Sequence, residues 1–144
     1  MSKEFLENFY IKTTEKVRNL IIVKRDLDIK IVKEKVISII GPRRAGKTYF
    51  LFQIMKDIIE NSLYLDFEDF LVKQSKNLEV LEFILTKNKK FVFLDEIQNL
   101  KNWESLVRTL LNQGYKVFIT GSSSKLLSKE IATQLRGRSL SYLL

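Results

Sequence analysis

Short apolar runs alternate with amphipathic stretches along most of the chain, and this alternation is the main indication of its fold. The runs VISII, SLYLDF, FVFLD and KVFIT are mostly apolar, which is typical of β-strands buried in a sheet. We predict strands at residues 36–40, 62–67, 91–95 and 116–120, and helices at 47–60, 78–86, from 102 onward and at 124–135. This order predicts an α/β fold in which helices cover both faces of a mostly parallel sheet.

The first 35 residues follow a different pattern. Residues 4–21 predict an amphipathic helix. Its apolar stripe consists of Phe5, Phe9, Thr13, Val17 and Leu20. Residues 27–40 then hold two β-branched runs separated by KEK, which indicates a small hairpin. We therefore divide the chain into an appended segment, residues 1–35, and a core, residues 36–144.

Composition narrows the chemistry that this chain can perform. The 144 residues include no cysteine and no histidine, which excludes disulfides and the usual ligands of zinc. No apolar run has the length of a membrane span, and the N-terminus does not resemble a secretory signal, so we expect a cytoplasmic protein without a membrane partner. The net charge of +8 favours a polyanionic partner such as nucleotide, nucleic acid or an acidic protein, although a solvated lysine-rich surface has the same charge.

The segment GPRRAGKT, Gly41 to Thr48, matches the phosphate-binding pattern G-x-x-x-x-G-K-[ST]. Gly41 and Gly46 allow a tight turn whose N–H groups point at an anion, and the following helix directs its N-terminal dipole at the same phosphates. In this interpretation Lys47 contacts the β- and γ-phosphates, and the Thr48 hydroxyl is a ligand of Mg²⁺. The predicted nucleotide-binding residues are Gly41, Pro42, Arg43, Arg44, Ala45, Gly46, Lys47, Thr48, Tyr49 and Ser122.

A carboxylate pair follows the third predicted strand of the core. FVFLDEIQ places Asp95 at the carboxyl edge of the sheet, where it can bind Mg²⁺, directly or through water. Glu96 can orient and deprotonate a water that attacks the γ-phosphate. Because adjacent strand residues point to opposite faces, the two carboxylates need not share one role.

Other polar residues at strand and helix ends have less specific patterns. Thr120, Ser122 and Ser123 follow the next strand, where a hydroxyl can contact the γ-phosphate or cap a helix. Arg138 in QLRGR is a candidate catalytic arginine, acting in its own chain or on a neighbouring subunit of a homo-oligomer, or a basic helix end. The acidic cluster in YLDFEDF is interpreted as structural, with tuning of Mg²⁺ as the alternative, and Trp103 as a core anchor of its helix, with base stacking as the alternative.

In combination, these motifs resemble the AAA-like P-loop ATPase family of archaea and bacteria. The resemblance covers residues 35–138 and rests on IIGPRRAGKTYFL, LYLDFED, FVFLDEIQNLKNWESLVRTL, VFITGSSSKLL and LRGR. It implies a three-layer core with strand order 5-1-4-3-2, ATP and Mg²⁺ as cofactors, Asp95 as the magnesium carboxylate and Glu96 as the base. It also implies a sensor hydroxyl at Ser122 or Ser123. Family members continue past the position of Leu144 into further ATPase elements and a C-terminal domain, so this chain is expected to be a fragment or a shortened relative.

Three functions are compatible with these motifs. The first is a Mg²⁺-dependent ATPase, and the second is a binding module whose conformation ATP controls with little hydrolysis. The third is a nucleic-acid-dependent motor fragment, although motor families generally separate the two motifs by more residues and add a second domain. No N/T-K-x-D motif is present for a GTPase, and the Asp-Glu pair suits water activation better than transfer to a small molecule.

Overall fold

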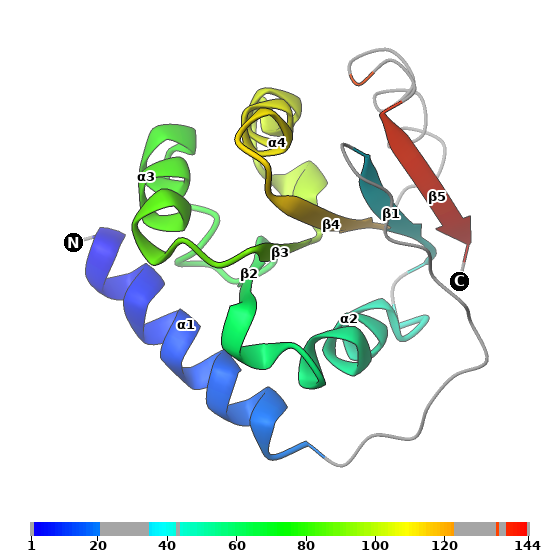
Figure 1. The fold of residues 1–144 in the computed structure, drawn as a ribbon, viewed down its shortest axis with the longest axis horizontal. Coiled ribbons are helices and arrows are strands. Elements are labelled where there is room, and N and C mark those ends of the chain that lie inside the picture. Colours follow the sequence, from blue (N-terminus) through cyan, green and yellow to red (C-terminus); the bar gives the residue numbers. More distant parts are fainter. Residues whose placement is uncertain (1, 21–34, 43, 123–134, 136–137, 144) are drawn as a thin grey trace.

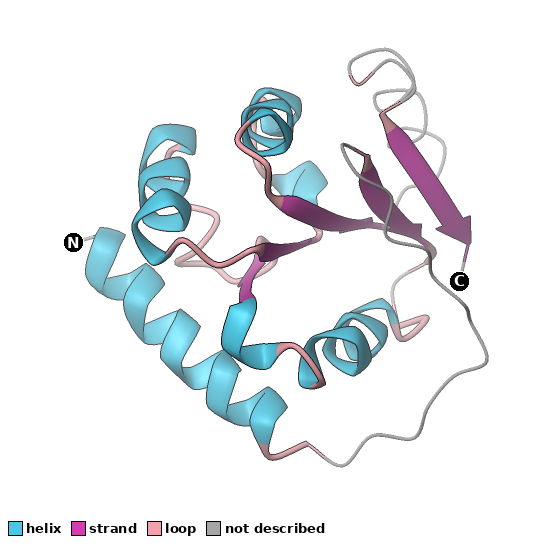
Figure 2. Cartoon of the chain, viewed as in Figure 1, coloured by secondary structure: helices cyan, strands magenta, loops and turns pink. Residues whose placement is uncertain are grey.

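The computed structural model describes residues 2–20, 35–42, 44–122, 135 and 138–143. Figures 1 and 2 show strands alternating with helices over this part of the chain. The elements are α1 (Ser2–Arg18), β1 (Val36–Ile40), α2 (Lys47–Lys56), the 3₁₀ turn η1 (Ile59–Asn61), β2 (Ser62–Asp66), α3 (Asn77–Lys87), β3 (Phe91–Asp95), the 3₁₀ turn η2 (Ile97–Asn99), α4 (Trp103–Asn112), β4 (Lys116–Gly121) and β5 (Ser139–Leu143).

The described strands form one sheet in the order β2-β3-β4-β1-β5, and all neighbouring strands are parallel. This confirms the predicted α/β fold and the order 5-1-4-3-2, read from the opposite edge. The central position of β1 explains why VISII is apolar throughout, because all five of its residues are buried.

Helices cover both faces of the sheet (Figure 1). Helices α3 and α4 lie on one face, where their apolar residues pack against Leu63, Val92 and Ile119. Helix α2 lies on the other face, where it packs against Ile37, Ile39 and other strand residues whose side chains point to that face. Helix α1 runs along the edge strand β2, from beside α3 to beside α2, and so covers an edge that would otherwise be open to pairing.

Strand alternation places three polar side chains on the face that α2 covers. Tyr64 belongs to the core cluster on that face, together with Phe93 and Phe118, whose rings stack with centroids 4.4 Å apart. Asp95 and Thr120 each come two residues after one of these phenylalanines, so they share its orientation. The register of the sheet therefore brings polar groups from β2, β3 and β4 to the first turn of α2.

The apolar stripe of the first helix differs from the prediction at one position. Thr13 and Val17 are buried as expected, but Phe5 is 39% exposed and Leu6 is fully buried. The first turn of α1 packs against the core cluster that includes residues of α3. Leu6 is the side chain that enters this cluster, and the adjacent Phe5 points away from it.

Several predicted boundaries also differ. Helix α2 ends at Lys56 and is followed by a separate 3₁₀ turn, where we expected a helix to residue 60. Both edges of β1 are occupied by the parallel strands β4 and β5. The first run of the predicted hairpin and nearly all of the predicted helix at 124–135 lie outside the described residues.

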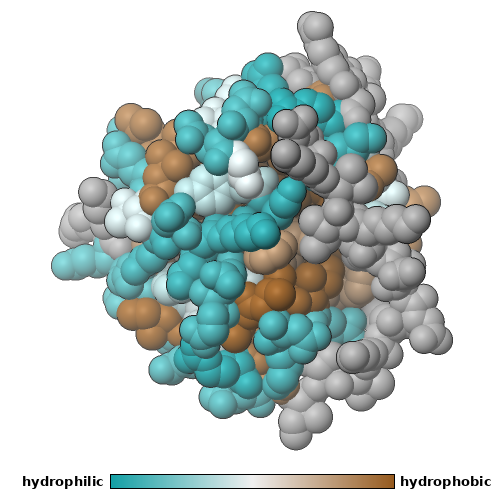
Figure 3. All heavy atoms as spheres, viewed as in Figure 1, coloured by the Kyte–Doolittle hydropathy of each residue, from teal (hydrophilic) through white to brown (hydrophobic). Residues whose placement is uncertain are grey.

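The surface is mainly hydrophilic in the view of Figure 3, with apolar residues gathered near the middle, where α2 and the sheet lie in Figure 1. In the part of the chain that the structure describes, no helix combines the length and the apolar character needed to cross a membrane.

Candidate active site

The loop between β1 and α2 turns sharply at two residues. Gly46 has a φ of 90° and Arg44 a φ of 64°, so both lie in the left-handed region that glycine adopts without steric cost. Gly46 is the N-cap of α2 and, as a glycine, has no side chain that could cap the first turn of that helix. The start of α2 thus follows a tight loop, an arrangement in which helix N-termini commonly bind anions.

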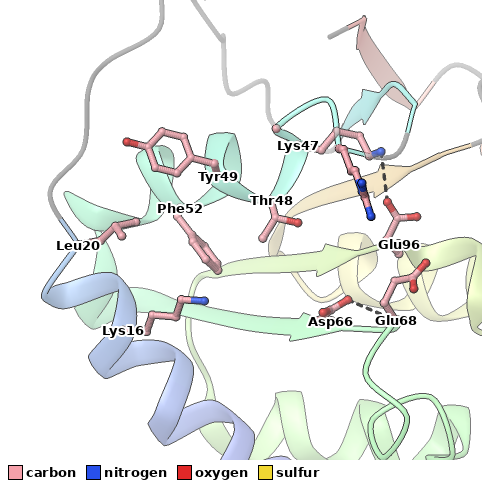
Figure 4. Close-up of a pocket in the computed structure, with 11 residues that line it drawn as sticks. Lys16, Leu20, Lys47, Thr48, Tyr49, Phe52, Asp66, Glu68 and Glu96 are labelled. Atoms are coloured by element: carbon pink, nitrogen blue, oxygen red, sulfur yellow. Dashed lines mark hydrogen bonds and ion pairs between the residues drawn. The ribbon is translucent and has the colours of Figure 1, made fainter.

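Lys47 folds back across this loop. Its ammonium donates hydrogen bonds to the carbonyl oxygens of Gly41, at 2.7 Å, and Pro42, at 3.0 Å. It also lies 3.3 Å from Glu96 Oε1, and the Lys47 residue is only 5% exposed. The positive charge is therefore held between the carbonyl oxygens of the loop and the carboxylate of Glu96 (Figure 4).

Asp95 accepts hydrogen bonds on both of its carboxylate oxygens. Thr48 Oγ1 donates to Oδ2 at 2.6 Å, and the Tyr64 hydroxyl donates to the same oxygen. Thr120 Oγ1 donates to Oδ1, so donors from α2, β2 and β4 fix the carboxylate in place. Burial, followed by the charge of Asp95, raises the pKa of Tyr64 well above 10, which keeps its hydroxyl protonated as a donor.

Glu96 follows β3 directly and adopts a left-handed backbone conformation, with φ 53° and ψ 50°. Its backbone N–H donates to Thr120 Oγ1 at 2.8 Å, while Ser122 Oγ and Gln98 Nε2 donate to Glu96 Oε2 at 2.6 and 2.7 Å. Burial alone would raise the pKa of Glu96, but the hydrogen bonds from Ser122 and Gln98, with the Lys47 ammonium, lower it below its usual value. Glu96 is therefore ionised at neutral pH.

The structure brings most of the predicted site residues together. Lys47, Thr48, Asp95, Glu96 and Ser122 are joined by direct contacts at the carboxyl ends of β1, β3 and β4. Arg44 and Tyr49 line the adjoining pocket, and Ala45 and Gly46 complete the loop. Arg43 and Ser123 lie outside the described residues.

Arg138 is not near the loop of its own chain. Its carbonyl oxygen accepts from the N–H of Val36, and its guanidinium donates to Asn112 at the end of α4. Arg138 thus lies at the amino-terminal end of β1, roughly 15 Å along the strand from the loop between β1 and α2. The structure therefore does not bring Arg138 to the loop of its own chain, because the residue precedes β5 instead of following a strand.

Tyr64 and Gln98 contact the two carboxylates and were not among the predicted site residues. Tyr64 looked like an ordinary apolar strand residue in SLYLDF, and Gln98 belongs to a 3₁₀ turn that the helix pattern does not reveal. The signal that could have found Tyr64 is its position two residues before the strand end that carries Asp66, on the same face of the sheet as Asp95.

A pocket of about 570 Å³ opens beside the loop and continues past Thr48 towards α1. Figure 4 shows Lys47 and Glu96 on one side of it, and Asp66, Glu68 and Lys16 on another. The lining residues are Lys16, Leu20, Arg44, Gly46, Lys47, Thr48, Tyr49, Phe52, Asp66, Glu68 and Glu96. The site thus includes residues from both the loop and the N-terminal helix.

Asp66 has a pKa raised to about 6, chiefly because of its burial. The folded protein therefore binds this proton more tightly than the unfolded chain, so its stability falls as pH rises from about 4 to about 6 and stays lower above that. We expect D66N, measured without nucleotide or Mg²⁺, to raise the melting temperature by a few degrees at pH 7.5 and by less at pH 4. The exposed D57N is the control, and equal shifts at both pH values would contradict the prediction.

The donor set at Thr48 and Asp95 fits a hard cation. A hydroxyl and a carboxylate in contact at 2.6 Å offer oxygen ligands of the kind that Mg²⁺ prefers. In the described ranges no group of three or more acidic side chains forms a complete metal site. Mg²⁺ usually takes one or two protein ligands and completes its shell with water and substrate phosphates.

Two relatives share much of the sequence. An uncharacterized protein of Methanocaldococcus jannaschii is 45% identical over 143 residues, which is 96% of this chain and 32% of the relative. An uncharacterized protein of Haemophilus influenzae is 40% identical over 118 residues, which is 72% of this chain and 29% of the relative. The chain thus spans about a third of the length of these curated relatives.

Two solved structures share the fold. C. elegans PCH-2 matches with a TM-score of 0.54 at 17% identity, over 98% of this chain and 41% of that one. Saccharomyces cerevisiae RIF2 matches with a TM-score of 0.50 at 16% identity, over 100% of this chain and 60% of that one. The sequence profile of the AAA domain family matches residues 33–144, which include the loop, both carboxylates and every strand of the sheet. The chain therefore belongs to the AAA domain family of P-loop ATPases.

Proposed function

We propose that the protein binds ATP with Mg²⁺ at the loop Gly41–Thr48 and hydrolyses its γ-phosphate. The observation that carries this proposal is the convergence of a cation, a hydroxyl and two carboxylates at adjoining strand ends. Backbone N–H groups of the loop and the Lys47 ammonium bind the phosphates. A magnesium ion held by Thr48 and Asp95 would neutralise the charge that develops on the phosphates during transfer.

Glu96 acts as the general base in this proposal. The oxygen of the attacking water bonds to the γ-phosphorus while the bond from that phosphorus to the β–γ bridging oxygen breaks, and ADP leaves. Glu96 accepts the proton of the water, and Ser122 and Gln98 hold its carboxylate in position. When the nucleotide binds, the Lys47 ammonium leaves Glu96 and contacts the phosphates instead.

One observation supports a second function, a nucleotide-controlled binding module with slow hydrolysis. The lowered pKa of Glu96 makes it a weaker base than a residue tuned close to neutral pH. If Glu96 keeps these contacts after ATP has bound, turnover will be slow and the nucleotide will act mainly by setting a conformation.

Titration of the full chain with ATP, with and without Mg²⁺, tests nucleotide binding, and a phosphate-release assay tests hydrolysis. We expect saturable binding that strengthens with Mg²⁺, because Thr48 and Asp95 offer the cation its protein ligands. Binding without phosphate release would favour the second function. Absence of any ATP binding would contradict both.

A further inference from the structure

Tyr64 lies on β2, next to the strand that carries the metal carboxylate. The register pairs Asp66 with Asp95, so Tyr64, two residues earlier, is a diagonal neighbour of Asp95 on the same face. Its hydroxyl reaches Asp95 Oδ2, the oxygen that also accepts from Thr48. Tyr64 is 4% exposed and Asp95 1% exposed, so solvent does not compete for this contact.

The donors around Asp95 have different roles once a cation is present. Thr48 is itself a proposed ligand, and its hydroxyl must turn a lone pair towards the cation. Tyr64 has no such second role, and its donation to Oδ2 can persist while the metal binds. It therefore holds the oxygen that faces Thr48, and with Thr120 on Oδ1 it fixes the plane of the carboxylate.

The ring of Tyr64 is held between two helices. Phe9 of α1 stacks on it with centroids 6.0 Å apart, and Phe52 of α2 meets it edge-on at 5.0 Å. These contacts limit how far the hydroxyl can move from Asp95. Phe9 belongs to a helix that lies outside the region matched by the family profile.

Polar contacts fix α1 at both of its ends. Near its start, Glu7 pairs with Lys87 of α3 at 2.6 Å. At its end, Lys56 of α2 donates to the carbonyl oxygens of Arg18 and Leu20. The Phe9 ring is therefore presented to β2 by a helix anchored to both neighbouring helices.

We propose that Tyr64 is a positioning residue for the magnesium carboxylate Asp95, and that helix α1 acts on the same carboxylate through the stacking of Phe9 on Tyr64. The inference rests on the proposed function, because it assumes that Mg²⁺ binds with nucleotide at Thr48 and Asp95.

The test measures ADP and ATP affinity of the full chain as a function of Mg²⁺ concentration, a binding readout that does not depend on turnover. Y64F removes only the hydroxyl, and we expect it to raise the Mg²⁺ concentration at half-maximal effect by about tenfold, the scale of one hydrogen bond to a charged group. Nucleotide affinity in EDTA should stay within about twofold, which also shows that the variant is folded.

F9L removes the stacked ring and keeps an apolar side chain, so we expect a smaller shift of about threefold in the same direction. In the Y64F background F9L should add no further shift, because its effect is transmitted by the missing hydroxyl. F5L on the same helix is the matched control and should leave the Mg²⁺ requirement unchanged, since Phe5 is partly exposed and lies off this contact.

An unchanged Mg²⁺ requirement in Y64F, with normal Mg²⁺-dependent binding by the wild-type protein, would overturn this inference alone. A shift by F9L that persists in the Y64F background would overturn the link through Phe9. Failure of the wild-type protein to bind nucleotide would overturn the proposed function and this inference together, so the failures are distinguishable.

Discussion

E96Q is expected to slow phosphate release from ATP by at least about 100-fold, the usual contribution of a positioned general base. Glutamine cannot take the proton of the attacking water, but its amide oxygen can still accept from Ser122. Nucleotide affinity should stay the same or increase, because Lys47 no longer has a carboxylate partner that competes with the phosphates. Single-turnover phosphate release at saturating ATP and Mg²⁺ measures the first effect, and equilibrium titration measures the second.

E82Q is a suitable control for that experiment, since Glu82 is an exposed carboxylate on α3, away from the pocket. It should leave both turnover and affinity unchanged. Equal turnover by the wild-type protein and E96Q would remove the role of Glu96 as base. The binding-module function would then be the better description of the chain.

K47A is expected to weaken ATP binding by roughly 100-fold, because it removes a charge-assisted contact to the phosphates. The same change removes the Lys47 donor from the carbonyl oxygens of Gly41 and Pro42, and it removes the cation beside Glu96 Oε1. We therefore also expect a loss of stability, on the order of 1–3 kcal/mol in the free energy of unfolding. Isothermal titration and chemical denaturation measure the two effects separately.

K56A offers a matched control for K47A at the opposite end of α2. Lys56 also donates to backbone carbonyl oxygens, those of Arg18 and Leu20, but it does not line the pocket. K56A should lower stability and leave ATP affinity nearly unchanged. Wild-type affinity in K47A would reject the assignment of the phosphate cradle.

Much of the fold and the centre of the site could be predicted from local pattern. The run Val36–Ile40 is apolar throughout because β1 lies inside the sheet, and the two glycines that follow mark the turn. Asp95 could be placed because parallel strands bring their carboxyl ends to one edge. The strand order itself came from the family resemblance, since local periodicity does not encode which strands are neighbours.

The contacts that were missed depend on alignments between distant segments. Tyr64 reaches Asp95 only because β2 and β3 pair in one particular register. Phe5 and Leu6 are adjacent apolar residues, and the direction in which α1 crosses β2 decides which of them is buried. Arg138 was misplaced because its strand enters the sheet beside β1, which leaves the residue at the far end.

The ion pair between Lys47 and Glu96 has a consequence for when the base becomes effective. A triphosphate that draws the ammonium away removes one of the influences that hold down the proton affinity of Glu96. Binding of the triphosphate would thereby raise the proton affinity of Glu96, and in an empty pocket the Lys47 ammonium would keep that affinity low. Under the proposed mechanism, the ion pair would make deprotonation of water depend on prior binding of the triphosphate.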